Sequence, residues 1–190
     1  NWYKDNQKWD TAIDILKLIL SIDPKDSWAR KEIVECFRGK YANHSRLEDI
    51  IRSSDLTQEY RNIFEAINDF EKHIAFDVKH FVYHRSWGVG VIRKVENEKL
   101  IINFGKKFGI HEISLKMAVS ALTPLANDHI WVLKATKSKE ELVKLVKDDV
   151  IGTLKTIIKS FGNSCDFKRI KAELVPSILT TGEWTSWNTK

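Results

Sequence analysis

Three histidines in the middle of the sequence have the clearest capacity for chemistry. His80 and His84 stand four residues apart, and His111 follows in the same region. Imidazole nitrogens bind zinc and other transition metals, so three histidines that meet could form a metal site. In a strand, however, residues 80, 82 and 84 share one face, and Val82 indicates that this face meets the core. We therefore interpret His84 as a histidine that hydrogen-bonds a backbone group inside the fold, and we expect no metal.

Two glycines between these histidines could instead belong to a phosphate-binding loop. Gly88 and Gly90 are not followed by Gly-Lys-Ser/Thr, which excludes a Walker loop. They also lack the third glycine of a dinucleotide fingerprint, and they run into residues typical of a strand. Paired glycines in a strand indicate a bulge or a sharp bend. We expect both glycines to be structural, and we expect no cofactor.

The other reactive residue types form no catalytic set. Cys36 and Cys165 are far apart, each in an apparent helix, and the sequence contains no CxxC pair. This pattern argues against a zinc site and against a disulfide framework. The adjacent carboxylates Asp148 and Asp149 lie at a helix junction, where helix capping explains them. We expect no catalytic residues and no enzymatic activity.

The composition is that of a soluble globular protein. The 190 residues are 43% hydrophobic and 30% charged, with only three prolines and eight glycines. The longest apolar run, AIDILKLILSI, carries Asp14 and Lys17 and is shorter than the roughly 20 residues that span a bilayer. We therefore expect no membrane segment. The sequence starts at Asn1 without a methionine, so we also expect it to be a piece of a longer protein.

The positive charge is concentrated in one segment. The net charge is +5, and the segment from Lys79 to Ser120 has eight basic residues against three acidic residues. This segment therefore carries the whole excess. A basic module between neutral ones favours a polyanionic or acidic partner.

The first 76 residues predict helices. In WDTAIDILKLILSIDP the apolar positions repeat every three or four residues, and Pro24 ends the segment. DSWARKEIVECFRGKY follows, with Asp26 or Ser27 as its N-cap. SRLEDIIRSS and TQEYRNIFEAINDFEKHIAF predict two more helices, the last of them opened by Thr57.

One spacing in the first helices is typical of a tetratricopeptide repeat. Ala12, Leu16 and Pro24 match the second half of that pattern, with leucine in place of an aromatic residue. The match fails at Arg46, where the next small residue is expected. A degenerate tetratricopeptide-like array and an ordinary helical bundle both remain open.

Residues 79–120 change from a helical to a strand pattern. FVYH, VGVIRKVE, KLIINFG and GIHEIS are short and rich in β-formers, and the turn-like segments RSWG, ENEK and GKKF separate them. Strands of this number and length predict a small, strongly bent sheet or a barrel of four or five strands. LKMAVSALTPL then leads away as a short helix and a linker around Pro124.

The C-terminal part is helical again. DHIWVLKAT, SKEELVKLVKDD, VIGTLKTIIKSFG and DFKRIKAELVPSIL follow one another, with a capping box at Ser138 and Glu141 and an N-cap at Asp166. The two tryptophans of the tail EWTSW are expected to pack on a neighbouring element that is missing or mobile. The predicted class is α+β, with a helical tetratricopeptide-like region at 1–76, a small β-barrel at 77–126 and a helical region at 127–190.

The barrel segment contains a recognisable motif. The pattern V-x-H-x-x-x-G-x-G-x-I is carried by Val82, His84, Gly88, Gly90 and Ile92, and Phe104 and a turn ending at Gly109 follow it. This segment resembles the Tudor-like RNA-polymerase-interacting module of CarD-type regulators and of the transcription-repair coupling factor. The family opens with Gly-Asp where this sequence has Lys79-His80, so the first turn is expected to differ.

The order of the three regions is similar to the long N-terminal extension fused to GreA-type transcript cleavage factors in some bacteria. The resemblance implies a bacterial, cytoplasmic, non-catalytic part of a transcription elongation factor, with RNA polymerase as its partner. It also suggests docking by pairing of an exposed edge strand with a sheet of the partner. The carboxylate-bearing helical hairpin of GreA is not present in this sequence.

For this docking, KLIINF and its neighbour VIRKVE are the predicted edge strands, joined by an exposed ENEK turn. Ile101 and Asn103 are expected to face the partner, and Arg93, Lys94 and Lys99 are expected to steer its approach. The alternative is a barrel that binds DNA or RNA with its basic residues and its aromatic side chains. The aromatic candidates are Phe81, Tyr83, Trp87 and Phe108.

Overall fold

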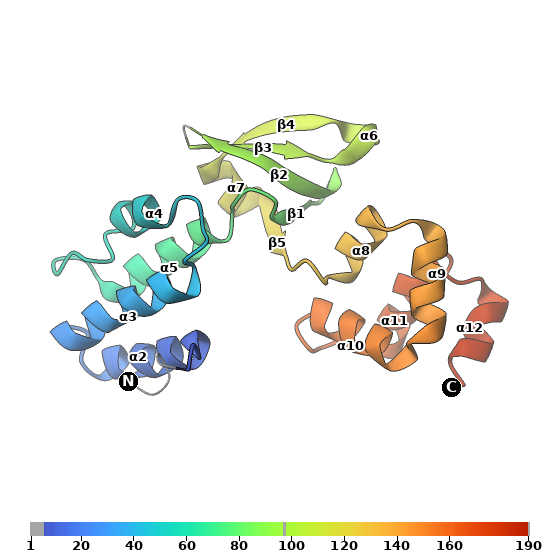
Figure 1. The fold of residues 1–190 in the computed structure, drawn as a ribbon, viewed down its shortest axis with the longest axis horizontal. Helices are drawn as coiled ribbons and strands as arrows, with labels where there is room; N and C mark the ends of the chain where they lie inside the picture. The colour runs from blue at the N-terminus through green and yellow to red at the C-terminus, as the bar shows by residue number, and fades with distance from the viewer. Residues whose placement is uncertain (1–5, 97, 190) are drawn as a thin grey trace. The chain divides into compact units, whose positions relative to one another are not determined.

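The computed structural model describes residues 6–96 and 98–189. The protein has the predicted α+β class, with helices before and after a five-stranded antiparallel sheet (Figure 1). It consists of two compact units. The first contains the N-terminal helices through Lys79 together with Ile92–Ile101 and Glu112–Ser120. The second contains His80–Val91, Ile102–His111 and the segment from Ala121 onward.

The N-terminal region contains the four predicted helices: α2 (Trp9–Ile22), α3 (Ser27–Lys40), α4 (Leu47–Ser53) and α5 (Ile63–Ile74). Asp26 is the N-cap of α3, as predicted, and its carboxylate accepts a hydrogen bond from the Ala29 N–H (2.8 Å). The prediction that Thr57 opens the last helix is wrong. Asn62 caps α5 instead, because its side chain accepts hydrogen bonds from the Phe64 and Glu65 N–H groups.

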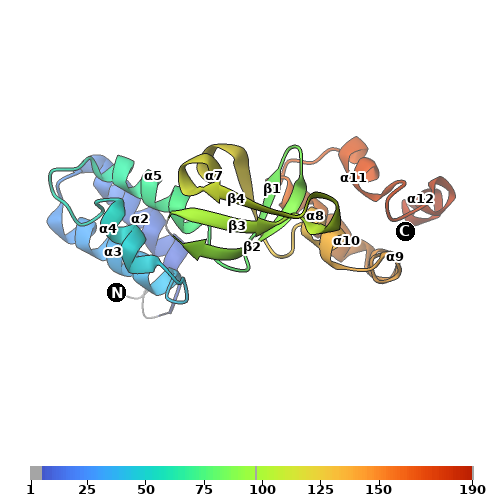
Figure 2. The same ribbon diagram turned by 90° about the horizontal axis from the view of Figure 1, so that it is seen from above.

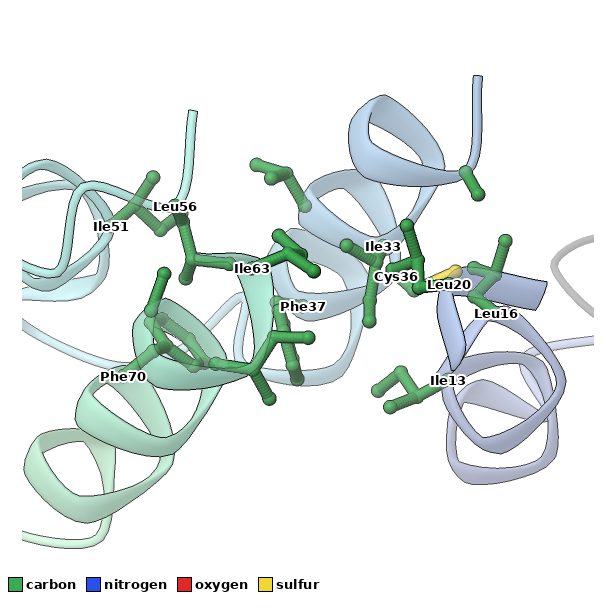
Figure 3. Close-up of a cluster of buried hydrophobic side chains, with 14 of the residues drawn as sticks. Ile13, Leu16, Leu20, Ile33, Cys36, Phe37, Ile51, Leu56, Ile63 and Phe70 are labelled. Carbon is green, nitrogen blue, oxygen red and sulfur yellow. The ribbon is translucent and has the colours of Figure 1, made fainter. Parts of the chain in front are cut away.

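Apolar side chains from all four helices form one hydrophobic core (Figure 3). Leu20, Ile33, Phe37 and Phe70 are almost completely buried, and the rings of Phe37 and Phe70 lie 4.4 Å apart between centroids. Burial of each such side chain stabilises the fold by about 1.5–3 kcal/mol. The helical period in the sequence therefore identified most of the buried positions. Trp28, Tyr60 and Phe64, which the same spacing places on the buried faces, are exposed instead.

The predicted strands are present. They are β1 (Phe81–His84), β2 (Gly88–Glu96), β3 (Lys99–Asn103), β4 (Ile110–Ser114) and β5 (Leu122–Leu125). Their order is β4-β3-β2-β1-β5, and β2, β3 and β4 lie side by side in Figure 2. The sheet is open, so of the two predicted forms, a strongly bent sheet or a small barrel, the structure has an open sheet and not a closed barrel. In the predicted ENEK turn, Asn97 lies outside the described residues.

The predicted linker around Pro124 is a strand. After the short helices α6 (Gly105–Phe108) and α7 (Leu115–Ala121), β5 pairs antiparallel with β1, with Leu122 opposite His84 and Leu125 opposite Phe81. Leu122 is buried, which fixes the strand against the sheet. In the sequence, the proline indicated a linker because proline cannot donate a hydrogen bond within a sheet. An edge strand tolerates a residue without an N–H group.

The C-terminal region contains α8 (Ile130–Thr136), α9 (Lys139–Asp148), α10 (Val150–Ser160), α11 (Phe167–Leu174) and α12 (Thr181–Trp187). The capping box of Ser138 and Glu141 and the N-cap Asp166 are confirmed. So is the role of Asp149, which caps α10 by accepting from the Gly152 N–H (2.8 Å).

The expectation that the two C-terminal tryptophans pack on a missing or mobile element is wrong. Trp184 and Trp187 are each only 5% exposed and belong to the core of the C-terminal helices. A second capping box, formed by Thr180 and Glu183, starts the helix that carries them. The Trp187 Nε1–H donates to the Val146 carbonyl (2.7 Å), so the tail packs on its own domain.

Among the described residues, the structure has no helix that is both long enough and apolar enough to cross a membrane.

Candidate interaction surface

The motif residues meet at one end of the sheet. Val82 lies opposite Gly90 and His84 opposite Gly88 in the pairing of β1 with β2. Gly88 has a φ of +73°, a conformation that other residues adopt at a cost. Gly90 is required for a different reason, because a Cβ atom there would lie 2.6 Å from Cδ1 of Phe104. Both glycines thus have the predicted structural role.

Trp87 is held between two imidazole rings. Its centroid is 4.0 Å from that of His84 and 3.9 Å from that of His111, with interplanar angles of 20° and 22°. Such stacking on both sides places the histidines on opposite faces of the indole. The ring of Phe104, which is buried, lies 5.3 Å from the Trp87 ring. This stack joins β1 and the turn after it to β4.

Each histidine of the stack is also bound to the backbone. The Ser86 N–H donates to Nδ1 of His84 (3.2 Å), which confirms the predicted backbone bond of that residue. Nε2–H of His111 donates to the Phe108 carbonyl (2.9 Å). The prediction that His84 lies inside the core is wrong, because its side chain is half-buried. Among the described residues no three His, Cys, Asp or Glu side chains form a group that could hold a metal ion.

The same end of the sheet carries positive charge. Arg85, Lys106 and Lys107 are exposed, and the two segments that supply them, 80–91 and 102–111, contain no acidic residue. None of these three side chains forms an ion pair with another described residue. Nζ of Lys107 lies 5.1 Å above the ring centre of Phe108. We call Arg85, Lys106 and Lys107 the cationic end of the sheet.

The residues predicted to bind a partner lie on β2 and β3. Arg93 and Lys94 are exposed, and Nζ of Lys94 forms an ion pair with Glu96 (2.6 Å). Lys99 pairs with Glu112 (2.5 Å), and this hydrogen bond raises the pKa of Lys99. Both lysine charges are therefore balanced locally, unlike those of the cationic end.

The expectation that β2 and β3 are edge strands is wrong. β3 lies between β4 and β2, and β2 lies between β3 and β1, so β4 and β5 are the edges. Ile101 is half-buried on β3. Asn103 is half-buried as well, and its side-chain oxygen accepts a hydrogen bond from the Gly105 N–H (2.9 Å), which stabilises the turn.

Sequence reasoning did not select the three residues of the cationic end. The net charge of the whole segment from 79 to 120 does not distinguish these three residues from the other basic residues of the segment. The signal was present, because basic residues without acidic neighbours mark the segments 80–91 and 102–111. The acidic residues of the module all lie in 92–101 and 112–120.

Comparison with known proteins relates the chain to GreA-associated regions. Residues 131–190 match the family of the GRAD helix-turn-helix domain. The whole chain is 54% identical, over 189 residues, to a protein of Treponema pallidum (strain Nichols) named for GreA-associated domains, of which the match covers 29%. No solved structure matches the chain.

Two further relatives are named transcription elongation factor GreA. The protein from Borreliella burgdorferi is 42% identical over 181 residues, which are 95% of this chain and 20% of that protein. The protein from Chlamydia pneumoniae is 25% identical over 177 residues, 91% of this chain and 24% of that protein. The chain thus spans less than a third of the length of each of these relatives. Its similarity is to a region of proteins related to a transcription elongation factor.

Proposed function

We propose that the chain is a non-catalytic binding region of a bacterial, cytoplasmic transcription elongation factor and that its sheet docks on RNA polymerase. Two relatives are named as GreA elongation factors, which supports polymerase as the partner. The motif from Val82 to Gly109 resembles a polymerase-interacting module. The same proposal includes two structural hypotheses: that the sheet is Tudor-like, and that α2 and α3 are tetratricopeptide-like. It also includes the domain bounds 1–76, 77–126 and 127–190.

The observation that carries the proposal is the position of β4 at an edge of the sheet. An edge strand has N–H and C=O groups that an incoming strand can pair with. The other edge, β5, has four residues, and Pro124 offers no N–H group. β4 has five residues and no proline, so it is the better template.

Two hydrogen bonds indicate which groups of β4 face outward. The Phe104 N–H donates to the Gly109 carbonyl (2.9 Å), and the Leu115 N–H donates to the Glu98 carbonyl (2.8 Å). In an antiparallel pair the residues alternate in the direction of their backbone groups. Residues 111 and 113 therefore point their backbone groups toward β3, and residues 110, 112 and 114 point theirs outward.

The cationic end adds a preference for an acidic partner. Lys106 and Lys107 lie in α6, which only Gly109 separates from β4, and neither forms an ion pair with a described residue. Charges at the rim of an interface chiefly raise the association rate, and each backbone hydrogen bond of strand pairing contributes about 0.5–1.5 kcal/mol. Arg93, Lys94, Lys99, Ile101 and Asn103 remain predicted contacts on neighbouring strands.

A proline at an outward position of β4 tests this proposal. We expect Glu112→Pro to weaken binding to purified RNA polymerase at least tenfold, because it removes an outward N–H group. Glu112→Ala removes the same side chain and the ion pair with Lys99, and it should change the affinity less than about threefold. Equal loss in both variants, or no association of the unmodified chain with polymerase, would contradict edge pairing.

The alternative, a sheet that binds nucleic acid through its aromatic residues, has less support. Both faces of Trp87 are covered by histidines, and Tyr83 lies against Trp131 of α8 with ring centroids 4.5 Å apart. Of these candidates Phe108 is exposed, at 37%. Base stacking needs an open ring face. Binding of DNA or RNA that disappears when Arg85, Lys106 and Lys107 are replaced by alanine, without any polymerase association, would favour this alternative.

A further inference from the structure

A cavity lies within the first unit, between the N-terminal helices and α7. Its volume is about 590 Å³, and its walls come mainly from α4, α5 and α7 and from the turn between β2 and β3. Small-molecule sites in proteins usually have volumes of about 300–1,000 Å³. The cavity is therefore of the size that holds an organic ligand.

Part of the cavity lining is apolar. Ile50 of α4 and Phe76 after α5 are buried, and Leu115 and Val119 of α7 are half-buried. The Leu115 N–H donates to the Glu98 carbonyl (2.8 Å), which fixes the start of α7 to the turn between β2 and β3. An apolar group placed against these side chains removes their exposed surface, and its own, from water.

Three cations from different elements line the same cavity without a carboxylate partner. Arg46 is the N-cap of α4, Lys72 belongs to α5 and Lys116 belongs to α7. None of them forms an ion pair with a described residue. By contrast Lys17 and Lys40, on α2 and α3, each pair with a carboxylate of another helix. Arg46 is also half-buried, so a charge-assisted hydrogen bond from an anion would replace part of its lost hydration.

The acidic residues of the lining do not neutralise these cations. Asp69 is bound by the guanidinium of Arg61. Asp49 lies in the first turn of α4, where a carboxylate interacts favourably with the N-terminus of the helix. Neither Asp49 nor Glu98 forms an ion pair within the described part of the chain. The lining thus has three unpaired cations against two unpaired carboxylates, and an anionic ligand would balance the excess.

We propose that this cavity binds an amphipathic organic anion, a ring-sized apolar body that carries a carboxylate, sulfonate or phosphate group. The apolar body packs on Leu115 and Val119, and Arg46, Lys72 and Lys116 hold the anionic group. Arg46 can donate two parallel hydrogen bonds to such a group, whereas the lysines act as point charges. The site belongs to the first unit alone and is independent of the polymerase docking proposed for the sheet.

The probe for this site is anilinonaphthalene sulfonate, which combines an apolar aromatic body with one sulfonate. Its fluorescence rises in an apolar environment, so titration of the full chain measures its affinity. Phenylnaphthylamine is the same molecule without the sulfonate, and we expect it to bind about fivefold more weakly because it cannot use the three cations. Lys72→Ala, Lys116→Ala should weaken binding of the sulfonate about fivefold and change binding of the neutral compound less than about twofold.

A matched control removes the same charge elsewhere in the first unit. Lys25 and Lys31 are exposed, do not line the cavity and form no ion pair with a described residue. Lys25→Ala, Lys31→Ala should therefore change the affinity for the sulfonate less than about twofold.

A second variant tests the apolar part of the site. Val119→Trp fills the cavity and keeps every charge, so both compounds should bind at least about tenfold more weakly. Met117→Trp places the same side chain on α7 at a position that is 60% exposed, and it should leave both affinities unchanged. Urea unfolding of the two tryptophan variants distinguishes a filled cavity from a lost fold.

The proposal is overturned by any of four results: no saturable binding of the sulfonate, equal affinity for the charged and neutral compounds, equal losses in the two pairs of lysine variants, or unchanged binding by a folded Val119→Trp chain. RNA polymerase is absent from this assay, so its result does not depend on the docking of the sheet.

Discussion

A Cβ atom at Gly90 would lie 2.6 Å from Cδ1 of Phe104, so the backbone of β2 and the Phe104 ring are in direct contact. The ring is buried and also lies against Trp87, which His84 and His111 enclose. The glycine is therefore needed for space, and not for an unusual φ. This contact explains why the motif combines a small residue on one strand with an aromatic residue on another.

We expect Gly90→Ala to lower the free energy of unfolding by about 1–3 kcal/mol, because a methyl group overpacks a rigid contact. Urea unfolding measures this change. Gly182→Ala is the matched control, since a Cβ atom on that helical residue meets nothing within 4 Å, and alanine is the better helix former.

The cost of Gly90→Ala should fall when Phe104 is replaced by leucine in the same chain, because the smaller side chain leaves room for the methyl group. A double-mutant cycle provides the coupling energy. Strictly additive effects of the two substitutions would show that the contact does not determine the cost.

The indole of Trp187 anchors the C-terminal helix to α9. Trp187→Phe keeps most of the apolar burial but leaves the Val146 carbonyl without the Nε1–H donor at 2.7 Å. We expect a loss of about 1–3 kcal/mol in the free energy of unfolding. Trp28→Phe, at a side chain that is 54% exposed, should change stability by less than about 0.5 kcal/mol. Similar small effects at both positions would argue against a buried anchor.

Glu173 is a buried charge with three side-chain donors: Trp131, Lys134 and Arg169. Replacing it with alanine removes the shared acceptor of all three donors. We expect Glu173→Ala to cost about 3 kcal/mol, because breaking a buried ion pair leaves its partners uncompensated. Glu140→Ala on the exposed side of α9 should cost less than about 0.5 kcal/mol. Thermal and urea unfolding of both variants check this, and equal stabilities would contradict it.

His129 makes stability depend on pH. Its Nδ1 accepts a hydrogen bond from the Trp131 N–H (3.1 Å), which requires the neutral ring. Burial lowers the pKa of His129 below its ordinary value of 6.5, and the nearby carboxylates of Glu173 and Asp128 only partly oppose this effect. The unfolded chain therefore binds the proton more readily. Stability from this group is complete above about pH 6.5 and is lost as the pH falls through the lower pKa of the folded state.

His129→Asn should remove this pH dependence, because asparagine retains a capping oxygen and does not titrate. The measurement is the free energy of unfolding from about pH 5 to pH 7.5 for both proteins. The wild-type chain should lose more stability than the variant toward low pH. A difference between the two proteins that stays constant with pH would contradict the role of His129.

The local structure of this protein could be read from its sequence with few errors. Helices and strands followed the spacing of apolar residues, and caps such as Asp26, Ser138 and Asp166 set several of the helix starts. Both signals act within a few residues of the chain, so they are visible without any knowledge of the fold. Mistakes arose where a local signal was misleading, as with Pro124, which suggested a linker and lies in an edge strand.

The arrangement of the surface was decided only by the tertiary structure. Strand order depends on pairing between distant segments, so the sequence could not show that β3 is interior and β4 is an edge. The pairing of Lys99 with Glu112, and the covering of Trp87 by His84 and His111, also join residues that are far apart along the chain. The sequence by itself determined the elements, the glycine-rich motif and the charge of each segment. The fold determined which charges, rings and strand edges stay available to a partner, because availability depends on what the rest of the chain covers.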